Sequence, residues 1–514
     1  MPVTTSFPGI YILELPSNAH TIAAAPTSIA VFVGYSHPFK TKHPGVPIEL
    51  FSFADYEREF GGFIESDILD PTLPFAVNQF FLNGGTDAVV VGMVPGRYFD
   101  EATSPPTDKG PVVAGTVDLN GSIKFTAQEP TDRTPITIAI DNVQTATPTV
   151  GDITVTYGSQ QEIFRKVTLD STKPDFLQSR INSTSALVTV APDPTYPANL
   201  TKESGNINVA APAGSNGVFN VADYGTVFQA DNALDKWPLF NILVTPGVTD
   251  GVVLAEAVAF AERKLAFYIM DPPATSVADQ GAGATWIGNY PALAPQSQNA
   301  ALYFPYLQSG DPATGAAVTL PPSGSVAGIF ARTDTARGVW KAPAGIETTI
   351  LNTTGVMPAN VLTDQQHGVL NNLGIDCLRS FPGVGTVVFG ARTTVYPNTA
   401  LRTQWGYVPV RRMALFIEQT LKVNLTWVVF EPNDEPLWIA IRTTIEGFML
   451  SLFNQGAFAG SKPSEAFQVK CDSSTTTPDD VNNGIVNIVV AFAPLKPAEF
   501  VVIKIAQLAG QAQA

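Results

Sequence analysis

Side chains that could bind a metal ion are sparse in this sequence. Of its four histidines only His37 and His43 are close together, on either side of a proline-rich loop. Neither a thiol nor a carboxylate lies at ligand spacing from this pair, whereas a zinc site needs three or four clustered ligands. Both are interpreted as solvated loop histidines, and no metal ion or other cofactor is predicted.

Sequence patterns typical of enzymes are incomplete. The glycine-rich stretch 381–390 has neither G-x-G-x-x-G spacing nor a P-loop lysine, so it is interpreted as a turn between strands. Asp271 closes an apolar strand, where an α/β enzyme could hold a carboxylate, but the two prolines that follow favour a strand terminator. No serine or cysteine lies in a G-x-S-x-G elbow. We therefore predict that the chain is not an enzyme.

The densest polar motif lies between residues 331 and 343. Its charged and aromatic side chains are Arg332, Asp334, Arg337, Trp340 and Lys341. They could bind an anion, but no nucleophile or proton shuttle accompanies them, so catalysis is not expected. The motif is interpreted as an ion-paired structural element held by its tryptophan.

The composition favours a chain of several domains with much of its surface covered by partners. Its 514 residues allow two to four domains. Charged residues make up 14% of the chain, against roughly 25% in an average soluble protein. The formal net charge of −16, with no basic stripe, disfavours nucleic acid as a partner.

The sequence also predicts where the chain assembles. Cys377 and Cys471 fit a reducing compartment and could pair, but a disulfide framework is not expected. The first residues lack the basic segment and apolar core of a signal peptide. No run reaches the roughly 18 apolar residues of a transmembrane helix. Assembly in the cytoplasm, without insertion into a membrane, is expected.

Apolar patterns predict an α/β layer that is interrupted by an insertion. Buried strands are expected at 28–34 and 88–94, with helices at 53–60 and 73–82. From about 98 to 235 the chain is rich in Thr, Ser, Pro, Gly and Asn. Short alternating runs there predict strands at 136–140, 152–157 and 186–190. A βαβ unit follows, with strands at 240–244 and 266–270 and a helix at 252–264.

The last third begins with a loop-rich segment, 274–345. The strands expected after it are 375–381, 386–389, 427–430 and 500–505. A helix is expected at 410–421, and a second one runs from Leu437 to about Gln455. The second helix has a polar cap and acids at its start, a proline in its first turn and Gly456 at its end.

Seven segments of this chain resemble, in the same order, segments of contractile tail sheath proteins of phage tails and phage-tail-like injection systems. The most specific are SGSVAGIFARTDTARGVWKAPAG (323–345) and FEPNDEPLW (430–438). Others include FPGIYILE, QFFLNGG, FNILVTPG, AFYIMDPP and VPVRRMALFIEQ. The resemblance covers both ends and the α/β core and omits mainly residues 98–235 and parts of 274–320.

The resemblance implies a multidomain α/β (α+β) fold with an inserted β-rich domain. The expected parts are an N-terminal exchange arm (1–22), a discontinuous α/β sheath core (23–97 and 236–374), the inserted outer domain (98–235), a C-terminal inner domain (375–498) and a C-terminal exchange arm (499–514). It also implies a structural subunit that polymerises as stacked hexameric rings around an inner tube. Contraction of this metastable sheath would drive the tube through a target envelope, without a cofactor or nucleotide.

Other copies of the chain, the inner tube protein, and baseplate and terminator or cap proteins are the partners that the resemblance implies. Copies would be linked by strands added to a neighbour's sheet; ordinary intramolecular strands are the alternative. The exchanged residues would be Ile10, Tyr11, Ile12, Leu13, Phe500, Val501, Val502, Ile503, Lys504 and Ile505.

The helix that begins at Leu437 is the candidate contact with the tube. Its expected contact residues are Arg442, Glu446, Met449, Asn454 and Gln455. Related helices often carry several arginines near this end, whereas this one offers mainly Arg442, so a strongly electrostatic grip is not expected. A non-contractile phage-like structural protein, such as a baseplate, capsid or adhesin subunit, remains the alternative function.

Overall fold

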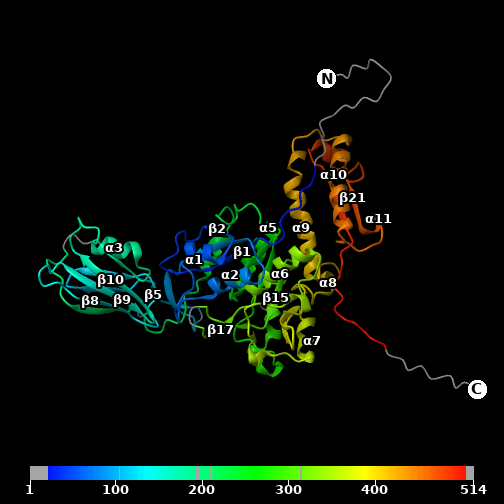
Figure 1. Cartoon of the computed structure of the whole chain (residues 1–514). Helices are drawn as coiled ribbons and strands as arrows, with labels where there is room; N and C mark the ends of the chain where they lie inside the picture. Colours follow the sequence, from blue (N-terminus) through cyan, green and yellow to red (C-terminus); the bar gives the residue numbers. More distant parts are fainter. Residues whose placement is uncertain are drawn as a thin grey trace, which may run out of the picture. The chain divides into compact units, whose positions relative to one another are not determined.

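The computed structural model describes residues 21–103, 105–192, 196–208, 211–292, 294–312 and 315–504 (Figure 1). They form two units: residues 27–411, and residues 412–504 together with 21–26. The boundary falls within one helix, α9 (Val408–Asn424). The predicted start of the C-terminal domain at residue 375 is wrong, because the strands that follow it belong to the large sheet of the first unit.

An eight-stranded mixed sheet forms the centre of the larger unit, in the order β2-β3-β1-β13-β14-β15-β19-β20. The strands are β1 (Ala30–Tyr35), β2 (Pro47–Leu50), β3 (Ala88–Met93), β13 (Ile242–Val244), β14 (Phe267–Met270), β15 (Ala300–Phe304), β19 (Ile375–Phe381) and β20 (Gly385–Val388). The six inner strands are parallel, and β2 and β20 pair antiparallel at the two edges. Every residue of β1 and β3 is buried, as expected for a parallel sheet covered on both faces. The predicted parallel layer is confirmed.

Capping residues set the helix ends of the larger unit. Its helices are α1 (Phe53–Phe60), α2 (Thr72–Leu82), α3 (Leu177–Thr184), α4 (Val221–Phe228), α5 (Gly251–Lys264), α6 (Ser323–Arg337), α7 (Asp364–Asn372) and α8 (Thr399–Trp405). Short 3-10 helices lie at Gln280–Thr285, Ile287–Ala292, Ile346–Thr348 and Pro358–Asn360, and a small sheet consists of β16 (Leu307–Gly310), β17 (Ala317–Leu320) and β18 (Gly355–Val356). Asp250, for example, accepts hydrogen bonds from the first backbone N–H groups of α5, which completes the predicted βαβ unit.

Helix α6 was missed in the segment 274–345, which was expected to be mainly loop. Its residues 323–331 are all buried, so apolar residues do not recur with the period of a half-exposed helix. Gly324 and Gly328 face α2 so closely that an added Cβ would lie 2.5 Å from the oxygen of Ala76 and 2.6 Å from that of Phe80. Small residues at this spacing therefore let two helix backbones pack in direct contact.

Asp271, at the end of β14, fixes the start of α6. Its fully buried carboxylate accepts hydrogen bonds from the backbone N–H of Gly247 (2.9 Å) and from the N–H (2.9 Å) and hydroxyl (2.5 Å) of Ser323. Burial raises the pKa of this carboxyl to about 6, although the three hydrogen bonds act in the opposite direction. The residue thus ends a strand, as predicted, and also ties the βαβ loop to the first turn of α6.

The inserted β-rich region has a hydrophobic core of its own, which extends from Leu119 to Ile207 (Figure 1, cyan). Its strands are β4 (Arg97–Asp100), β5 (Thr107–Pro111), β6 (Thr116–Leu119), β7 (Ile123–Ala127), β8 (Ile136–Asp141), β9 (Val150–Tyr157), β10 (Gln160–Thr168), β11 (Val188–Val190) and β12 (Glu203–Ile207). They form antiparallel sheets of four, three and two strands. At both ends of the predicted range 98–235 the chain also packs into the main core, through Tyr98 of β4 and the α4 residues Tyr224 and Phe228.

The smaller unit combines helices with a two-stranded sheet. After α9 come a 3-10 turn (Thr426–Val428), α10 (Glu435–Asn454), α11 (Pro463–Ala466), β21 (Phe467–Lys470), α12 (Pro478–Asn482) and β22 (Val489–Phe492). Residues 21–26 lie along α9, where Ala23 and Asn424 exchange hydrogen bonds of 2.9 and 2.8 Å. The strand predicted at 427–430 is wrong, because these residues form the 3-10 turn and a tight turn after it.

The close packing of α2 and α6 predicts the effect of Gly328→Ala. The new methyl group has to displace the α2 backbone, so the free energy of unfolding should fall by about 1–3 kcal/mol. Gly368→Ala is the matched control, because Gly368 is an exposed residue of α7 with open space around its Cβ position. It should raise stability by about 0.5–1 kcal/mol. Urea unfolding followed by tryptophan fluorescence measures both; equal effects would contradict this packing.

Asp271 also predicts a pH dependence. Since its pKa is higher in the folded chain than in the unfolded chain, its contribution to stability is greatest at low pH and is lost as pH rises through about 6. Between pH 5 and 7.5 the free energy of unfolding of the parent should fall by about 1.4 kcal/mol relative to that of Asp271→Asn, whose side chain cannot titrate. Urea midpoints of both proteins across this range test this, and parallel pH profiles would contradict it.

Candidate assembly interface

The sheet of the smaller unit can accept further strands. β21 and β22 pair antiparallel, with Phe467 opposite Phe492 and Val469 opposite Val490. No other strand of the described chain joins them, and beyond β22 the pairing continues only as an isolated bridge between Phe458 and Pro494. A sheet of two short strands is at best marginally stable in water, and its outer edges are open to pairing.

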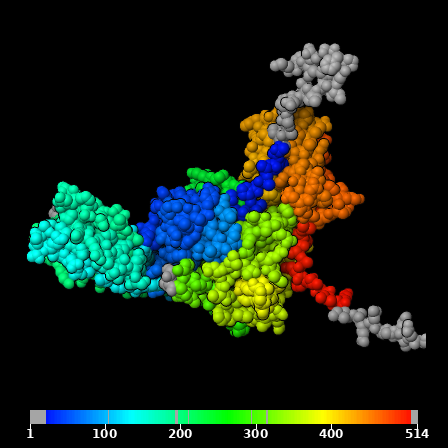
Figure 2. Space-filling view, in the orientation of Figure 1, coloured from blue at the N-terminus to red at the C-terminus, as the bar shows by residue number. Residues whose placement is uncertain are grey.

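An apolar tail follows this sheet. Phe500, Val501, Val502 and Ile503 expose 75–80% of their surface, and Lys504 is exposed as well. Figure 2 draws the end of the described chain in red. None of the strands in the described ranges includes residues 500–504, so the predicted strand is not formed within this chain. Ile505 and the N-terminal residues 10–13 lie outside the described residues.

Helix α10 begins and ends as predicted. The Asp434 carboxylate accepts a hydrogen bond from the N–H of Leu437, and Pro436 lies in the first turn. The side chains that face the core are Leu437, Ile441, Ile445, Phe448, Met449 and Leu452. Met449 is therefore wrong as a candidate tube contact, because it is completely buried on the same face as the predicted core residues.

The opposite face of α10 is available to a partner. Glu446, Asn454 and Gln455 are exposed, as a contact surface requires. Ile439 and Leu450 are also partly exposed on this helix and were not singled out in the sequence. Arg442 is only half-buried and lies toward the protein. Two hydrogen bonds from Ser474 lower the pKa of the Asp472 carboxyl, and the positive charge of Arg442 lowers it further. The exposed face is thus weakly charged and partly apolar.

The polar motif at 331–343 ends α6 and has a structural role. Arg332 donates a hydrogen bond to the carbonyl oxygen of Thr349 (2.6 Å), and Arg337 pairs with both carboxylate oxygens of Glu347 (2.9 and 3.0 Å). Lys341 donates to the carbonyl of Ala342, and burial lowers its pKa. Trp340 packs beside Gly338, which ends the helix with a φ of 89°. The ion pair involves Glu347, which the sequence analysis did not identify.

His37 differs from the solvated histidine that was expected. It is completely buried, and its Nε2 lies 3.1 Å from the Glu129 carboxylate of the inserted region, which also pairs with Lys40. Burial lowers the pKa of His37 to about 3, so the ring is neutral at physiological pH. His43 is exposed, as predicted, and pairs with Glu59. These residues make polar contacts between loops, and they do not form a catalytic group.

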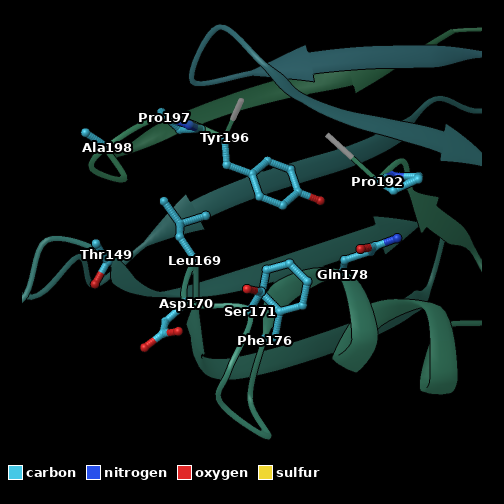
Figure 3. A pocket seen from close by; sticks show the side chains of 10 residues that line it. All are labelled: Thr149, Leu169, Asp170, Ser171, Phe176, Gln178, Pro192, Tyr196, Pro197 and Ala198. Carbon is cyan, nitrogen blue, oxygen red and sulfur yellow. The ribbon is translucent and has the colours of Figure 1, made fainter. Parts of the chain in front are cut away.

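An open cavity of about 680 Å³ lies in the inserted region (Figure 3). Its lining residues are Thr149, Leu169, Asp170, Ser171, Phe176, Gln178, Pro192, Tyr196, Pro197 and Ala198. The rings of Phe176 and Tyr196 lie 5.9 Å apart, and the described lining residues include no histidine, cysteine or lysine.

Searches for other chemical sites in the described ranges find none. No group of three or more His, Cys, Asp or Glu side chains there could hold a metal ion. Cys377 and Cys471 are both free and buried, and burial raises the pKa of each thiol. Within these ranges no helix combines the length and apolar character needed to cross a membrane.

Two of the solved structures with a similar fold come from large assemblies. A chain in the cryo-EM structure of the anti-feeding prophage helical sheath in the contracted state matches with a TM-score of 0.56 and 23% identity, covering 98% of this chain and 100% of that chain. A chain of the six-fold symmetrised anti-feeding prophage baseplate matches with a TM-score of 0.56 and 23% identity over 98% and 99% of the two chains. At this identity the likeness shows the fold, which is the mixed α/β multidomain fold expected from the sequence.

Sequence comparison extends the likeness to the family. The tail sheath protein of Burkholderia phage BcepMu is 28% identical over 257 residues, which are 48% of this chain and 52% of that protein, so the match spans about half of its length. The phage tail sheath protein central domain matches residues 229–394, and the phage tail sheath C-terminal domain matches residues 402–507. Together these two matches cover more than half of the chain. The chain belongs to the phage tail sheath protein family, whose members are structural proteins and not enzymes.

Proposed function

We propose that this chain is a subunit of a contractile sheath, which polymerises as stacked hexameric rings around an inner tube and contracts to drive the tube through a target envelope. The observation that carries the proposal is the exposed apolar tail 500–503 in the same unit as the open sheet β21–β22. The tail would add as a strand to this sheet in a neighbouring copy. The solved helical sheath and six-fold symmetrised baseplate of similar fold support assembly into a ringed, helical sheath.

Strand addition suits a polymer whose copies have to shift relative to one another during contraction and still stay linked. Backbone hydrogen bonds form a ladder that holds two copies together, while alternate side chains bury apolar surface on either face. Covering each Val, Ile or Phe of the tail contributes about 1.5–3 kcal/mol before the cost of association. The remaining contacts between copies are then free to exchange during contraction, so that a smaller interface is replaced by a larger one.

The other partners in the proposal are the inner tube, the baseplate and a terminator or cap protein. The exposed face of α10, with Glu446, Asn454 and Gln455, is the proposed tube contact. A weakly charged face can release the tube when the sheath contracts. The N-terminal arm, with Ile10 to Leu13, is proposed as a second exchanged strand. Assembly would take place in the bacterial cytoplasm, as part of a phage tail or a tail-like particle.

The C-terminal link is tested with Val501→Pro/Ile503→Pro. Proline removes two N–H groups that point to the same side of the tail strand, so the ladder cannot form on that side. The parent should form long striated cylinders in electron micrographs, whereas the proline variant should need at least about tenfold higher protein concentration, the equivalent of 1.4 kcal/mol. Val501→Thr/Ile503→Thr is the control, because it keeps both N–H groups and β-branched side chains and should assemble more readily than the proline variant.

Two results would contradict this proposal in different ways. Normal cylinders from the proline variant would leave the sheath in place and remove the C-terminal exchange. A parent chain that stays monomeric, even with tube and baseplate proteins present, would argue for the non-contractile alternative.

The N-terminal link is tested by deleting residues 1–16. Cylinders should be lost if this arm is also exchanged, because each copy then loses one of its two links. Residues 21–26, which contact α9, remain in place, so the fold of the smaller unit should be kept. Circular dichroism checks this, and cylinders that survive the deletion would rule out the N-terminal exchange.

A further inference from the structure

The loop between the 3-10 turn and α10 presents a fully exposed phenylalanine. Phe430 exposes 101% of its surface, the largest value among the exposed large apolar side chains of the described residues, and Val429 beside it exposes 62%. Single exposed apolar residues are common on proteins. This one is unusual because its backbone conformation is also unfavourable.

Phe430 occupies the third position of a tight turn. The N–H of Glu431 donates to the carbonyl oxygen of Val428 (3.2 Å), Val429 has φ −69° and ψ 127°, and Phe430 has φ 73°. These are the angles of a type II turn, which favours glycine or asparagine at this position. A bulky aromatic residue with positive φ is strained, and such strain is found mainly at functional sites.

Both sides of the turn are held in place by the rest of the unit. Before it, Val428 donates a backbone hydrogen bond to Leu425 (3.1 Å). After it, the Asn433 amide donates to the carbonyl of Ile485 (3.0 Å) and accepts from the indole N–H of Trp438 (2.9 Å). The ring is therefore presented at a fixed point, although nothing in the described chain covers it.

We infer that Phe430 is an anchor residue that packs against a second copy of this chain. The inference rests on the proposed sheath function, because a helical polymer presents the same surface on every copy. Rigidly held aromatic residues are typical binding hot spots, since little freedom is lost when they are covered. The exposed acidic residues Glu431, Asp434 and Glu435 follow Phe430 closely in the sequence, so the receiving surface should be an apolar recess with lysine or arginine at its rim. This contact is separate from the exchanged tail at 500–504.

The test compares Phe430→Asn with Phe430→Tyr in the full-length chain. Asparagine tolerates positive φ, so the variant loses the ring and relieves the strain. Its thermal unfolding midpoint before assembly should equal or exceed that of the parent, whereas its critical concentration for polymerisation, measured by sedimentation, should rise at least about tenfold. Tyrosine keeps the ring and the strain, so its critical concentration should stay within about twofold of the parent.

Several results would overturn the inference. If Phe430→Asn polymerises at the same critical concentration as the parent, Phe430 does not contribute to a contact between copies. If its unfolding midpoint is clearly lower than that of the parent, the ring stabilises the fold of its own chain instead. Photocrosslinking from p-benzoylphenylalanine at position 430 should join two copies in the polymer; crosslinks only to a tube protein would contradict a second copy as the partner. If the parent does not polymerise at all, the proposed function fails together with this contact.

Discussion

The two-stranded sheet β21–β22, whose edges stay unpaired in the described chain, is the feature on which the proposed assembly of this protein depends. β21 and β22 pair only with each other in the described chain, and the tail after them carries four exposed apolar residues in a row. Exposed edges and apolar strands favour pairing with another chain, and most proteins avoid them for that reason. In a sheath subunit the same property would give each copy a defined place for its neighbour.

The larger unit provides the rigid body that such a link would have to move. Its parallel sheet is buried on both faces, and α2 and α6 pack with their backbones in contact. The Asp271 carboxylate joins a loop of the βαβ unit to the first turn of α6 through three hydrogen bonds. Densely packed interiors of this kind do not deform gradually, so the motion of contraction would fall on contacts between copies.

The inserted region has a separate core and touches the main sheet region through polar side chains. Glu129 pairs with Lys40 and the buried His37, and Arg133 pairs with Asp67 (2.8 Å). A module with its own core can change in sequence without disturbing the large sheet. This separation explains why the resemblance to sheath proteins omits most of residues 98–235.

The sequence alone determined the family, the parallel layer, the βαβ unit and helix α10, because continuous apolar runs and capping residues act locally. It did not predict α6, since a helix buried on all sides has no amphipathic period. It also misplaced Met449, the solvation of His37 and the turn at Phe430, each of which depends on residues distant in the chain. Only the tertiary structure decided which apolar residues the chain buries itself. The sequence already shows that the tail and Phe430 are apolar. Only the tertiary structure shows that no other residue of the described chain buries them.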